Sequence, residues 1–326
     1  MVCESVRVRD RSFAVLLLGV VMALVAVMPF AGSAGAQDAT PEAEGLGLDL
    51  PEVQITASES TFSVSGSELL EGWTIITLIN ESETAAVANL ALLPEEQNVG
   101  DLTTVVSQAF AGEGGELPEW WANATFAGGA WADAGATTQA VVYFTPGEWV
   151  VYSSNPASAQ PPQKITILSI QEAVDLGILE PVATPVPGDD GSPVADDGAT
   201  PVVEGLPADS EISIVDGAIE TASAPVSGQQ LWQVTNNGSQ VSDLVLYAVD
   251  EELDDAAASE LATTVASGET PEGATLAGGM GALSDGGTAY LSANLEAGTY
   301  VAFSTQPDTA GGIQASNGVV LVFTVE

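Results

Sequence analysis

The sequence predicts an all-β protein built from two tandem antiparallel β-sandwich domains, each with one short helical insertion. The first observation is a series of short segments rich in Val, Ile, Thr and Tyr, with turn residues between them, which is typical of sandwiches and barrels. The second is that this series stops in a Pro, Gly and Asp-rich stretch and then starts again. The third is that the two series match in order and spacing, which indicates a tandem duplication.

The first domain is expected to span residues 51–170. Its predicted strand segments are VQITASESTFSV, WTIITLIN, ANLALL, TTQAVVYF, EWVVYSS and KITIL, and its helical insertion is VGDLTTVVSQAF. The Gly-rich segment GEGGELPEWWANATFAGGAW, residues 112–131, is interpreted as a long loop. A short lead, residues 37–50, is expected to be disordered.

The second domain, residues 207–326, repeats this pattern. Its predicted strand segments are EISIVDGAIETAS, LWQVTNN, DLVLYAV, GTAYLSANL, TYVAFST and GVVLVFTVE. In its helical insertion, EELDDAAASELATTV, the residues Leu253, Ala257, Leu261 and Val265 recur at spacing four and predict one apolar stripe against the sheet. Residues 171–206 are predicted to form an extended, mobile linker that charge repulsion keeps open.

The N-terminal segment has the layout of a secretory signal. Arg7, Arg9 and Arg11 precede the apolar run FAVLLLGVVMALVAVMPF and the small residues AGSAGA, which predicts a signal peptide over residues 1–36 with cleavage after Ala36. The alternative is an uncleaved membrane anchor, because the apolar run is close to the length that spans a bilayer. After cleavage we expect no membrane span and a secreted, extracellular or cell-envelope-associated protein.

The charge is strongly one-sided. The chain has 4 Lys and Arg residues against 45 Asp and Glu residues, a formal net charge of −41, and removal of the signal would leave Lys164 as the only cation. Such a polyanion should be repelled by phosphate backbones, so nucleic acid is excluded as a partner. The acidic surface suits high salt, low pH or weak divalent cation binding, although no calcium-loop motif is present.

The residue types that are missing exclude much chemistry. The chain has no histidine, and its single cysteine, Cys3, lies in the signal segment. Thiol and Ser-His catalysis, zinc sites of the usual kind and His- or Cys-bound haem are therefore excluded. Lys164 is interpreted as a solvent-facing strand residue rather than a Schiff-base lysine. Pairs of carboxylates stay chemically open, but no spacing selects one pair, so we expect no enzyme activity and no cofactor.

Two segments carry a family resemblance. TPGEWVVYSS and EAGTYVAFST resemble the penultimate strand of cupredoxins, the blue-copper proteins, where a Pro-Gly-x-Tyr turn leads into a strand that ends at the copper-binding cysteine. The turn after WTIITLIN resembles the one that carries the first histidine ligand, and SNGVVLVFTVE resembles the segment that starts with the axial methionine. The resemblance covers nearly all of both domains and implies a Greek-key sandwich in each.

The copper ligands of that family are absent at the matching positions. Blue copper needs a thiolate, two imidazoles and a weak axial ligand, and a serine hydroxyl cannot replace the thiolate. The resemblance therefore implies a redox-inactive scaffold without type 1 copper. The degenerate ligand positions are Ser153 and Ser304 for the cysteine, Ala85 or Ala86 and Ser242 or Asp243 for the first histidine, and Val319 for the methionine.

The tryptophans of residues 112–131 are the most distinctive remaining feature. Trp120, Trp121 and Trp131 could present indole rings to a ligand such as a sugar, or Trp121 and Trp131 could pack as a small satellite core. The sequence favours a secreted, non-catalytic interaction or structural protein with an unknown extracellular or cell-envelope partner. The alternatives are a carbohydrate- or cation-binding module and, third, an enzyme that uses carboxylates alone.

Overall fold

A computed structural model describes residues 46–66, 69–110, 117–158, 160–180, 205–309 and 311–326. The chain divides into two units, Met1–Ala39 and Thr40–Glu326, and all described residues belong to the second. The predicted signal segment, residues 1–36, and most of the predicted linker, residues 181–204, lie outside the described residues.

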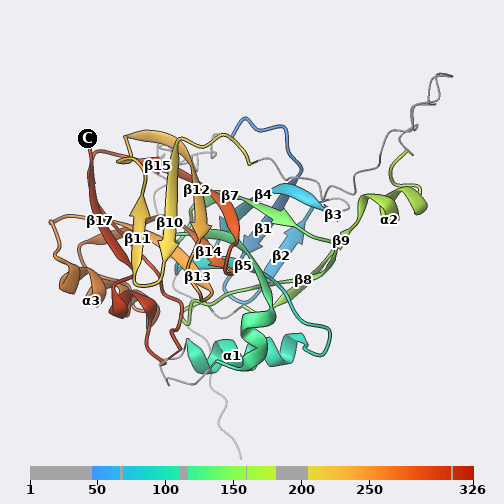
Figure 1. Cartoon of the computed structure of the whole chain (residues 1–326), viewed down its shortest axis with the longest axis horizontal. Coiled ribbons are helices and arrows are strands. Elements are labelled where there is room, and N and C mark those ends of the chain that lie inside the picture. The colour runs from blue at the N-terminus through green and yellow to red at the C-terminus, as the bar shows by residue number, and fades with distance from the viewer. Residues whose placement is uncertain (1–45, 67–68, 111–116, 159, 181–204, 310) are drawn as a thin grey trace, which may run out of the picture. The chain divides into compact units, whose positions relative to one another are not determined.

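Each repeat contributes strands to two sheets (Figure 1). The strands of the first repeat are β1 (Glu52–Ala57), β2 (Phe62–Ser65), β3 (Leu69–Leu70), β4 (Gly72–Asn80), β5 (Ala86–Leu92), β6 (Thr125–Ala132), β7 (Thr137–Phe144), β8 (Gly147–Tyr152) and β9 (Gln163–Leu168). Those of the second are β10 (Ser210–Val215), β11 (Ala218–Thr221), β12 (Gly228–Asn236), β13 (Ser242–Val249), β14 (Ala274–Leu283), β15 (Thr288–Leu295), β16 (Gly298–Phe303) and β17 (Val320–Val325). The predicted all-β sandwich is confirmed.

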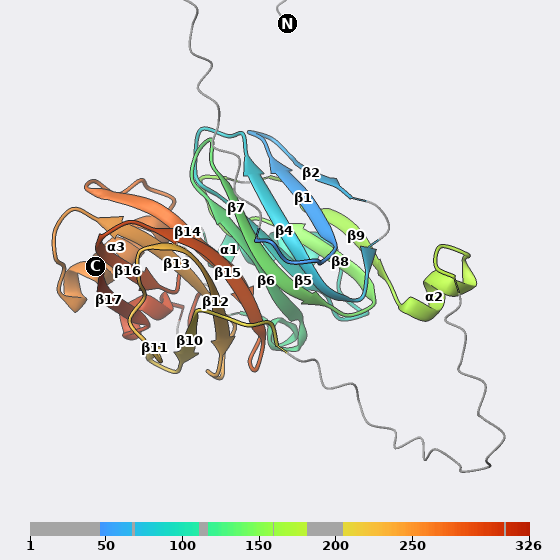
Figure 2. The ribbon, with the colours of Figure 1, turned by 90° about the horizontal axis from the view of Figure 1, so that it is seen from above.

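Both sheets run through both repeats. Their strand orders are β11-β10-β12-β15-β7-β4-β1-β2 and β17-β16-β13-β14-β6-β5-β8-β9-β3. The first sheet joins the repeats at β15 and β7, and the second joins them at β14 and β6. Figure 2 shows these blue-to-green and yellow-to-red strands meeting. One apolar core includes buried residues of both repeats, so the repeats share sheets and core.

The strand directions also repeat. Most neighbours are antiparallel, as expected, but β1 pairs in parallel with β4, β10 pairs in parallel with β12, and the short β3 pairs in parallel with β9. The pairs β1–β4 and β10–β12 occupy the same place in the two repeats. The sandwich is therefore mixed rather than purely antiparallel, and the shared exception supports the duplication.

The strands β6 and β14, which join the repeats in the second sheet, lie in Gly-rich segments. Strand β6 covers part of the predicted loop 112–131, so that prediction is wrong for residues 125–131. A side chain at Gly129, where φ is +137°, would bring its Cβ within 1.8 Å of the Ala88 carbonyl oxygen. A Cβ at Gly281 in β14 would lie 2.6 Å from the Asn89 side chain. These glycines therefore permit close strand packing, including packing between the repeats.

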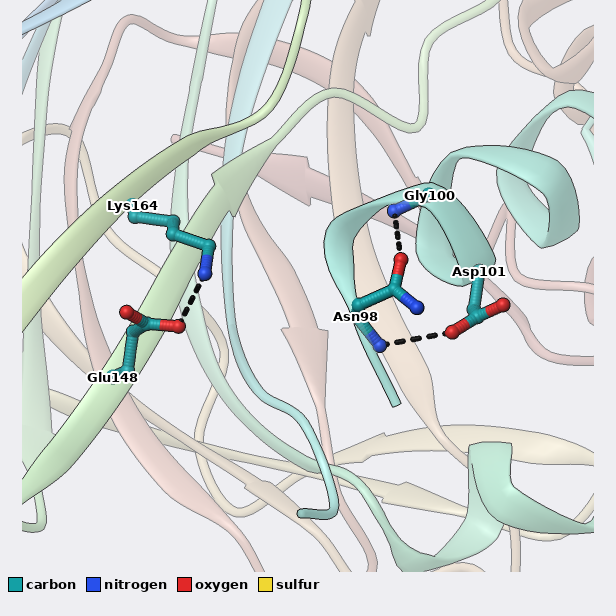
Figure 3. A network of polar contacts seen from close by, with 5 residues as sticks. All are labelled: Asn98, Gly100, Asp101, Glu148 and Lys164. Atoms are coloured by element: carbon teal, nitrogen blue, oxygen red, sulfur yellow. Dashed lines mark hydrogen bonds and ion pairs between the residues drawn. The ribbon is translucent and has the colours of Figure 1, made fainter. Parts of the chain in front are cut away.

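The helical insertions form where predicted. Helix α1 (Val99–Ala109) begins with a capping box (Figure 3). The Asn98 side chain accepts a hydrogen bond from the Gly100 N–H, and the Asp101 carboxylate accepts one from the Asn98 N–H. Helix α3 (Asp255–Ala266) begins at the cap Asp254. The buried residues of α3 are Ala258, Ala262 and Val265, while Leu253, Ala257 and Leu261 of the predicted stripe are only partly buried.

The ends of the predicted lead and linker are ordered. A small apolar cluster lies at the join of β7 and β15, and Leu46, Leu48 and Leu50 pack against it, as do Leu206 and Ala208. The Tyr290 hydroxyl of that cluster accepts a hydrogen bond from the Leu206 backbone N–H at 2.7 Å. A third helix, α2 (Ile170–Asp175), occupies the start of the predicted linker. Two 3-10 turns, η1 (Glu119–Asn123) and η2 (Gln314–Asn317), complete the described elements.

Candidate functional site

The strand register defines two equivalent sites, one in each repeat. Asn89 lies opposite Tyr152 and Val245 lies opposite Phe303, so the residues that follow β8 and β16, Ser153 and Ser304, are equivalent. Counting back along the partner strands makes Val87 the equivalent of Asp243, and Ala86 the equivalent of Ser242. We call the surroundings of Ser153 the first-repeat site and the surroundings of Ser304 the second-repeat site.

The second-repeat site is organised around Asp243, which has no exposed surface. Its Oδ1 accepts from the Thr305 backbone N–H at 2.7 Å and lies 2.9 Å from the Ser304 hydroxyl. Its Oδ2 accepts from the Thr305 hydroxyl at 2.6 Å and from Gln306 Nε2 at 3.2 Å. The buried carboxylate is therefore surrounded by donors from one short segment.

Gln314 of η2 extends this network. Its Oε1 accepts from the Ser242 hydroxyl at 2.6 Å and its Nε2 donates to the Val241 carbonyl at 2.7 Å. Val319, at the predicted axial position, is buried in the main apolar core, and its carbonyl accepts from the Ser304 N–H. The second-repeat site is thus filled by side chains that bond to one another, and only the Gln306 amide oxygen is buried without a partner among the described residues of this network.

Burial has a clear electrostatic effect at this site. It raises the pKa of Asp243, although the hydrogen bonds from Thr305, Gln306 and Ser304 oppose the increase. Burial, with the negative charge of Asp243, also raises the pKa of Tyr152 well above its ordinary value. Tyr152 belongs to the first repeat, so the charge of the second-repeat site acts on the first.

The first-repeat site has no carboxylate at its centre. Ala86 and Val87 are fully buried, and Ala85 is partly buried. The Ser153 hydroxyl accepts a hydrogen bond from the Asn155 backbone N–H at 3.2 Å, and Asn155 Nδ2 donates to the Ala85 carbonyl at 2.7 Å.

A cleft of about 500 Å³ opens at the first-repeat site. Helix α1 forms one wall, and the segment after β8 forms the other. The lining comprises Thr103, Val106, Ser107, Phe110, residues 152–156 and residues 160–162. The hydroxyl of Tyr152 is buried and has no hydrogen-bond partner among the described residues.

Of the three predicted ligand-binding tryptophans, Trp120 and Trp121 lie together, with ring centres 5.8 Å apart, and Trp131 lies in another cluster. Trp121 is buried with α1 and Phe126, whose ring centre lies 4.7 Å from that of Trp121. Trp131 is buried in a different cluster with Tyr247 and residues of α3. Trp120 is only partly buried against the first of these clusters. The structure therefore favours the packing interpretation for Trp121 and Trp131.

The donors present do not fit a blue-copper ion. The equivalent positions hold serine hydroxyls, alanines and one internally bonded carboxylate, whereas type 1 copper requires thiolate and imidazole ligands. Within the described ranges, no group of three or more His, Cys, Asp or Glu side chains is placed to hold a metal ion. Lys164 lies on the exposed surface of β9 in an ion pair with Glu148 (Figure 3).

None of the helices in the described part of the chain is both long and apolar enough to cross a bilayer. This observation does not include the predicted signal segment, which lies outside that part.

Similar folds occur among solved copper proteins. No protein-family model and no curated protein matches the chain. Reduced auracyanin from Roseiflexus castenholzii matches with 21% identity over 36% of this chain and 94% of its own, at a TM-score of 0.26. Auracyanin A from Chloroflexus aurantiacus, a blue copper protein, matches with 14% identity over 36% of this chain and 96% of its own, at a TM-score of 0.27. Copper nitrite reductase from Nitrosomonas europaea matches with 13% identity over 84% of this chain and 93% of its own, at a TM-score of 0.22.

The chain has a β-sandwich scaffold made of two repeated halves, and the resemblance to cupredoxins stays a prediction from the sequence. Because the identities and TM-scores are low, the strand order and the repeated parallel pair describe the sandwich better than these alignments do. The chemistry of the copper proteins does not transfer with the fold.

Several residues of the two sites are visible only in the structure. Sequence comparison selected Ser242, Asp243 and Ser304, but Gln306 and Gln314 enter the network through turns after β16 that no pattern predicts. Tyr152 occupies the strand position that Phe303 holds in the second repeat. The extra hydroxyl of the tyrosine was the signal that could have drawn attention to it.

Proposed function

We propose that the protein is a redox-inactive, non-catalytic binding protein that acts outside the cytoplasmic membrane. The observation that carries the proposal is the self-contained network at Asp243, where the resemblance places a copper site. Both oxygens of the Asp243 carboxylate already accept two hydrogen bonds each, so they offer no open coordination position, and the one buried acceptor of this network without a partner among the described residues is the neutral amide oxygen of Gln306. The first-repeat site, with Ser153 and Ala86, likewise provides no soft or imidazole ligand.

The proposal of a non-catalytic role follows from the position of the perturbed carboxylate. A general acid or base must come within hydrogen-bond reach of the substrate. Asp243 is fully enclosed by Ser304, Thr305 and Gln306. Its carboxylate therefore holds the segment after β16 in place rather than contacting a substrate.

The proposed location and partner rest on the sequence. The signal-like segment supports export, and the large excess of acidic residues supports a solvated surface in an extracellular or cell-envelope setting. The same charge argues against nucleic acid as a partner.

A copper titration tests this proposal. The purified protein is stripped with a chelator and titrated with Cu²⁺, with Mg²⁺ at the same concentration as the control for non-specific binding to carboxylates. We expect no thiolate–copper absorption band and the same melting temperature with both ions, because an ion that does not bind the native state cannot stabilise it. Stoichiometric copper binding that is lost in Ser153→Ala or in Ser304→Ala would refute the proposal.

A further inference from the structure

We infer that the cleft of the first-repeat site binds a small, uncharged and largely apolar molecule that carries a carbonyl oxygen. This inference rests on the proposed function, because a copper ion held at Ser153 would occupy the same place. It adds a ligand class to a site that the copper-binding resemblance leaves without one.

The size and walls of the cleft suit such a molecule. Its volume of about 500 Å³ lies within the range of about 300–1,000 Å³ that is usual for small-molecule sites. Val106 and Phe110 supply apolar surface from α1, and Pro156, Pro161 and Pro162 supply it from the opposite wall. Proline fixes its own φ angle, so the opposite wall is largely preformed and loses little freedom on binding.

The lining also offers hydrogen-bond donors in excess of acceptors. The Tyr152 hydroxyl has no partner among the described residues, although it is buried. The hydroxyls of Ser153 and Ser154 each accept one hydrogen bond, from the Asn155 N–H and from Asn89 Nδ2. Neither serine hydroxyl donates to a described group. A buried donor without an acceptor costs about 1–3 kcal/mol, so a ligand oxygen that accepts from Tyr152 would recover part of that cost.

The other polar side chains of the lining are already satisfied. Asn155 donates to the Ala85 carbonyl and accepts from the Ala157 N–H. Gln160 accepts from the Ser158 hydroxyl and donates to the Ser58 carbonyl. These bonds fix the loop that forms the wall and leave donor capacity on three consecutive hydroxyls, residues 152–154, all of which are buried at the base of the cleft wall.

The charges at the cleft select a neutral ligand. No charged side chain is among the described residues that line it, so neither a cation nor an anion would find a partner. Burial and the nearby Asp243 charge raise the pKa of Tyr152, which keeps the phenol protonated and able to donate. The same charge of Asp243 repels an anionic ligand. A neutral carbonyl compound fits both conditions.

Three probes of similar shape separate these requirements. Acetophenone is neutral and has a carbonyl oxygen, α-methylstyrene replaces that oxygen with a methylene group, and benzoate replaces the ketone with an anion. By isothermal titration calorimetry with the full chain, we expect one acetophenone site with a dissociation constant below about 1 mM. We expect α-methylstyrene to bind about 3–10-fold more weakly, because it cannot accept a hydrogen bond, and benzoate to bind more weakly still.

Matched variants locate the site. Tyr152→Phe should weaken acetophenone binding about 3–10-fold and leave α-methylstyrene binding unchanged, whereas Tyr143→Phe, on β7 outside the cleft, should change neither. Ser107→Trp should fill the cleft and weaken both by more than about tenfold. Gln108→Trp, its exposed neighbour on α1 outside the lining, should have no effect. Melting temperatures close to that of the parent protein would show that the variants fold.

Three results would overturn the inference: no saturable acetophenone binding up to about 10 mM, equal binding by the parent protein, Tyr152→Phe and Ser107→Trp, or tighter binding of benzoate than of acetophenone. These results differ from a failure of the proposed function. Copper binding would refute that function whatever acetophenone does, while a metal-free protein that ignores acetophenone would refute only the ligand assignment.

Discussion

The first-repeat and second-repeat sites lie on equivalent strands and contain an equivalent serine, but the first site has a cleft and the second is filled by side chains. Ser153 is 7% exposed and borders a cleft of about 500 Å³, whereas Ser304 has no exposed surface and lies in a network of side chains. The central difference is one residue on the partner strand, Val87 in the first repeat and Asp243 in the second. A carboxylate at this position draws donors from the segment after the strand, and a valine does not.

The helical insertions contribute to the same difference. Val106 and Phe110 of the α1 region line the cleft, while Ser259 of α3 donates to the Ala315 carbonyl in η2 and so holds the turn that carries Gln314. One copy of the duplicated site is therefore closed by its own insertion and turn, and the other copy keeps space for a ligand. The duplication allows one repeat to provide structure and the other to provide binding.

The largest expected effect comes from removing the carboxylate. Asp243→Ala would leave buried donors of Thr305 and Gln306 without an acceptor, and should lower the free energy of unfolding by about 3–5 kcal/mol. The equivalent change in the first repeat, Val87→Ala, removes only apolar contacts and should cost about 1–3 kcal/mol. Urea unfolding measures both. Equal losses in the two variants would show that the carboxylate does not organise its site.

The next effect concerns Asn89, whose side chain forms one of the hydrogen bonds between the repeats. Asn89 Oδ1 accepts from the Ala282 N–H at 2.8 Å, and Asn89 Nδ2 donates to Ser154 at 2.9 Å. Asn89→Ala should therefore cost about 2–3 kcal/mol. The exposed Asn123, which makes one bond to its own 3-10 turn, is the control, and Asn123→Ala should change the free energy of unfolding by about 0.5 kcal/mol or less. A loss at Asn89 as small as this would contradict the role given to it.

The sequence could predict the sandwich and the repeat, because alternating apolar residues and turn residues report directly on β-strands. It could not predict β6 and β14. Glycine-rich sequence is typical of loops. At Gly129 and Gly281, however, glycine is required because neighbouring groups leave no room for a side chain. Likewise, the alignment identified Ser153 and Ser304 as equivalent positions, but the cleft beside one and the network around the other depend on segments distant in sequence.

A smaller effect is expected in the pH dependence of stability. Because the pKa of Asp243 is raised by burial, the folded state binds this proton more tightly than the unfolded state does. The contribution of Asp243 is therefore most favourable below its unfolded pKa of about 3.9 and declines as pH rises through the folded pKa. The free energy of unfolding of the parent protein minus that of Asp243→Asn should fall over this range in urea titrations. A difference that rises with pH would contradict the direction of the shift.

The smallest effect is expected at the surface of the first repeat. Lys164 and Glu148 form an exposed ion pair, with side chains 54% and 60% exposed. Lys164→Gln should lower the free energy of unfolding by no more than about 0.5 kcal/mol, and it should leave acetophenone binding unchanged because Lys164 is outside the cleft. A loss of binding in this variant would place the ligand site elsewhere.

The most direct test of the contrast between the two sites is the reactivity of a cysteine placed at each serine. In a Cys3→Ser background, Ser153→Cys and Ser304→Cys would be labelled with a thiol reagent in the presence and absence of acetophenone. Accessible thiols react directly, and buried thiols react only after local opening. We predict labelling of Ser153→Cys at least about tenfold faster than that of Ser304→Cys, with acetophenone protecting only the former. Equal labelling rates, or no protection of Ser153→Cys, would contradict an open first-repeat site and a closed second-repeat site.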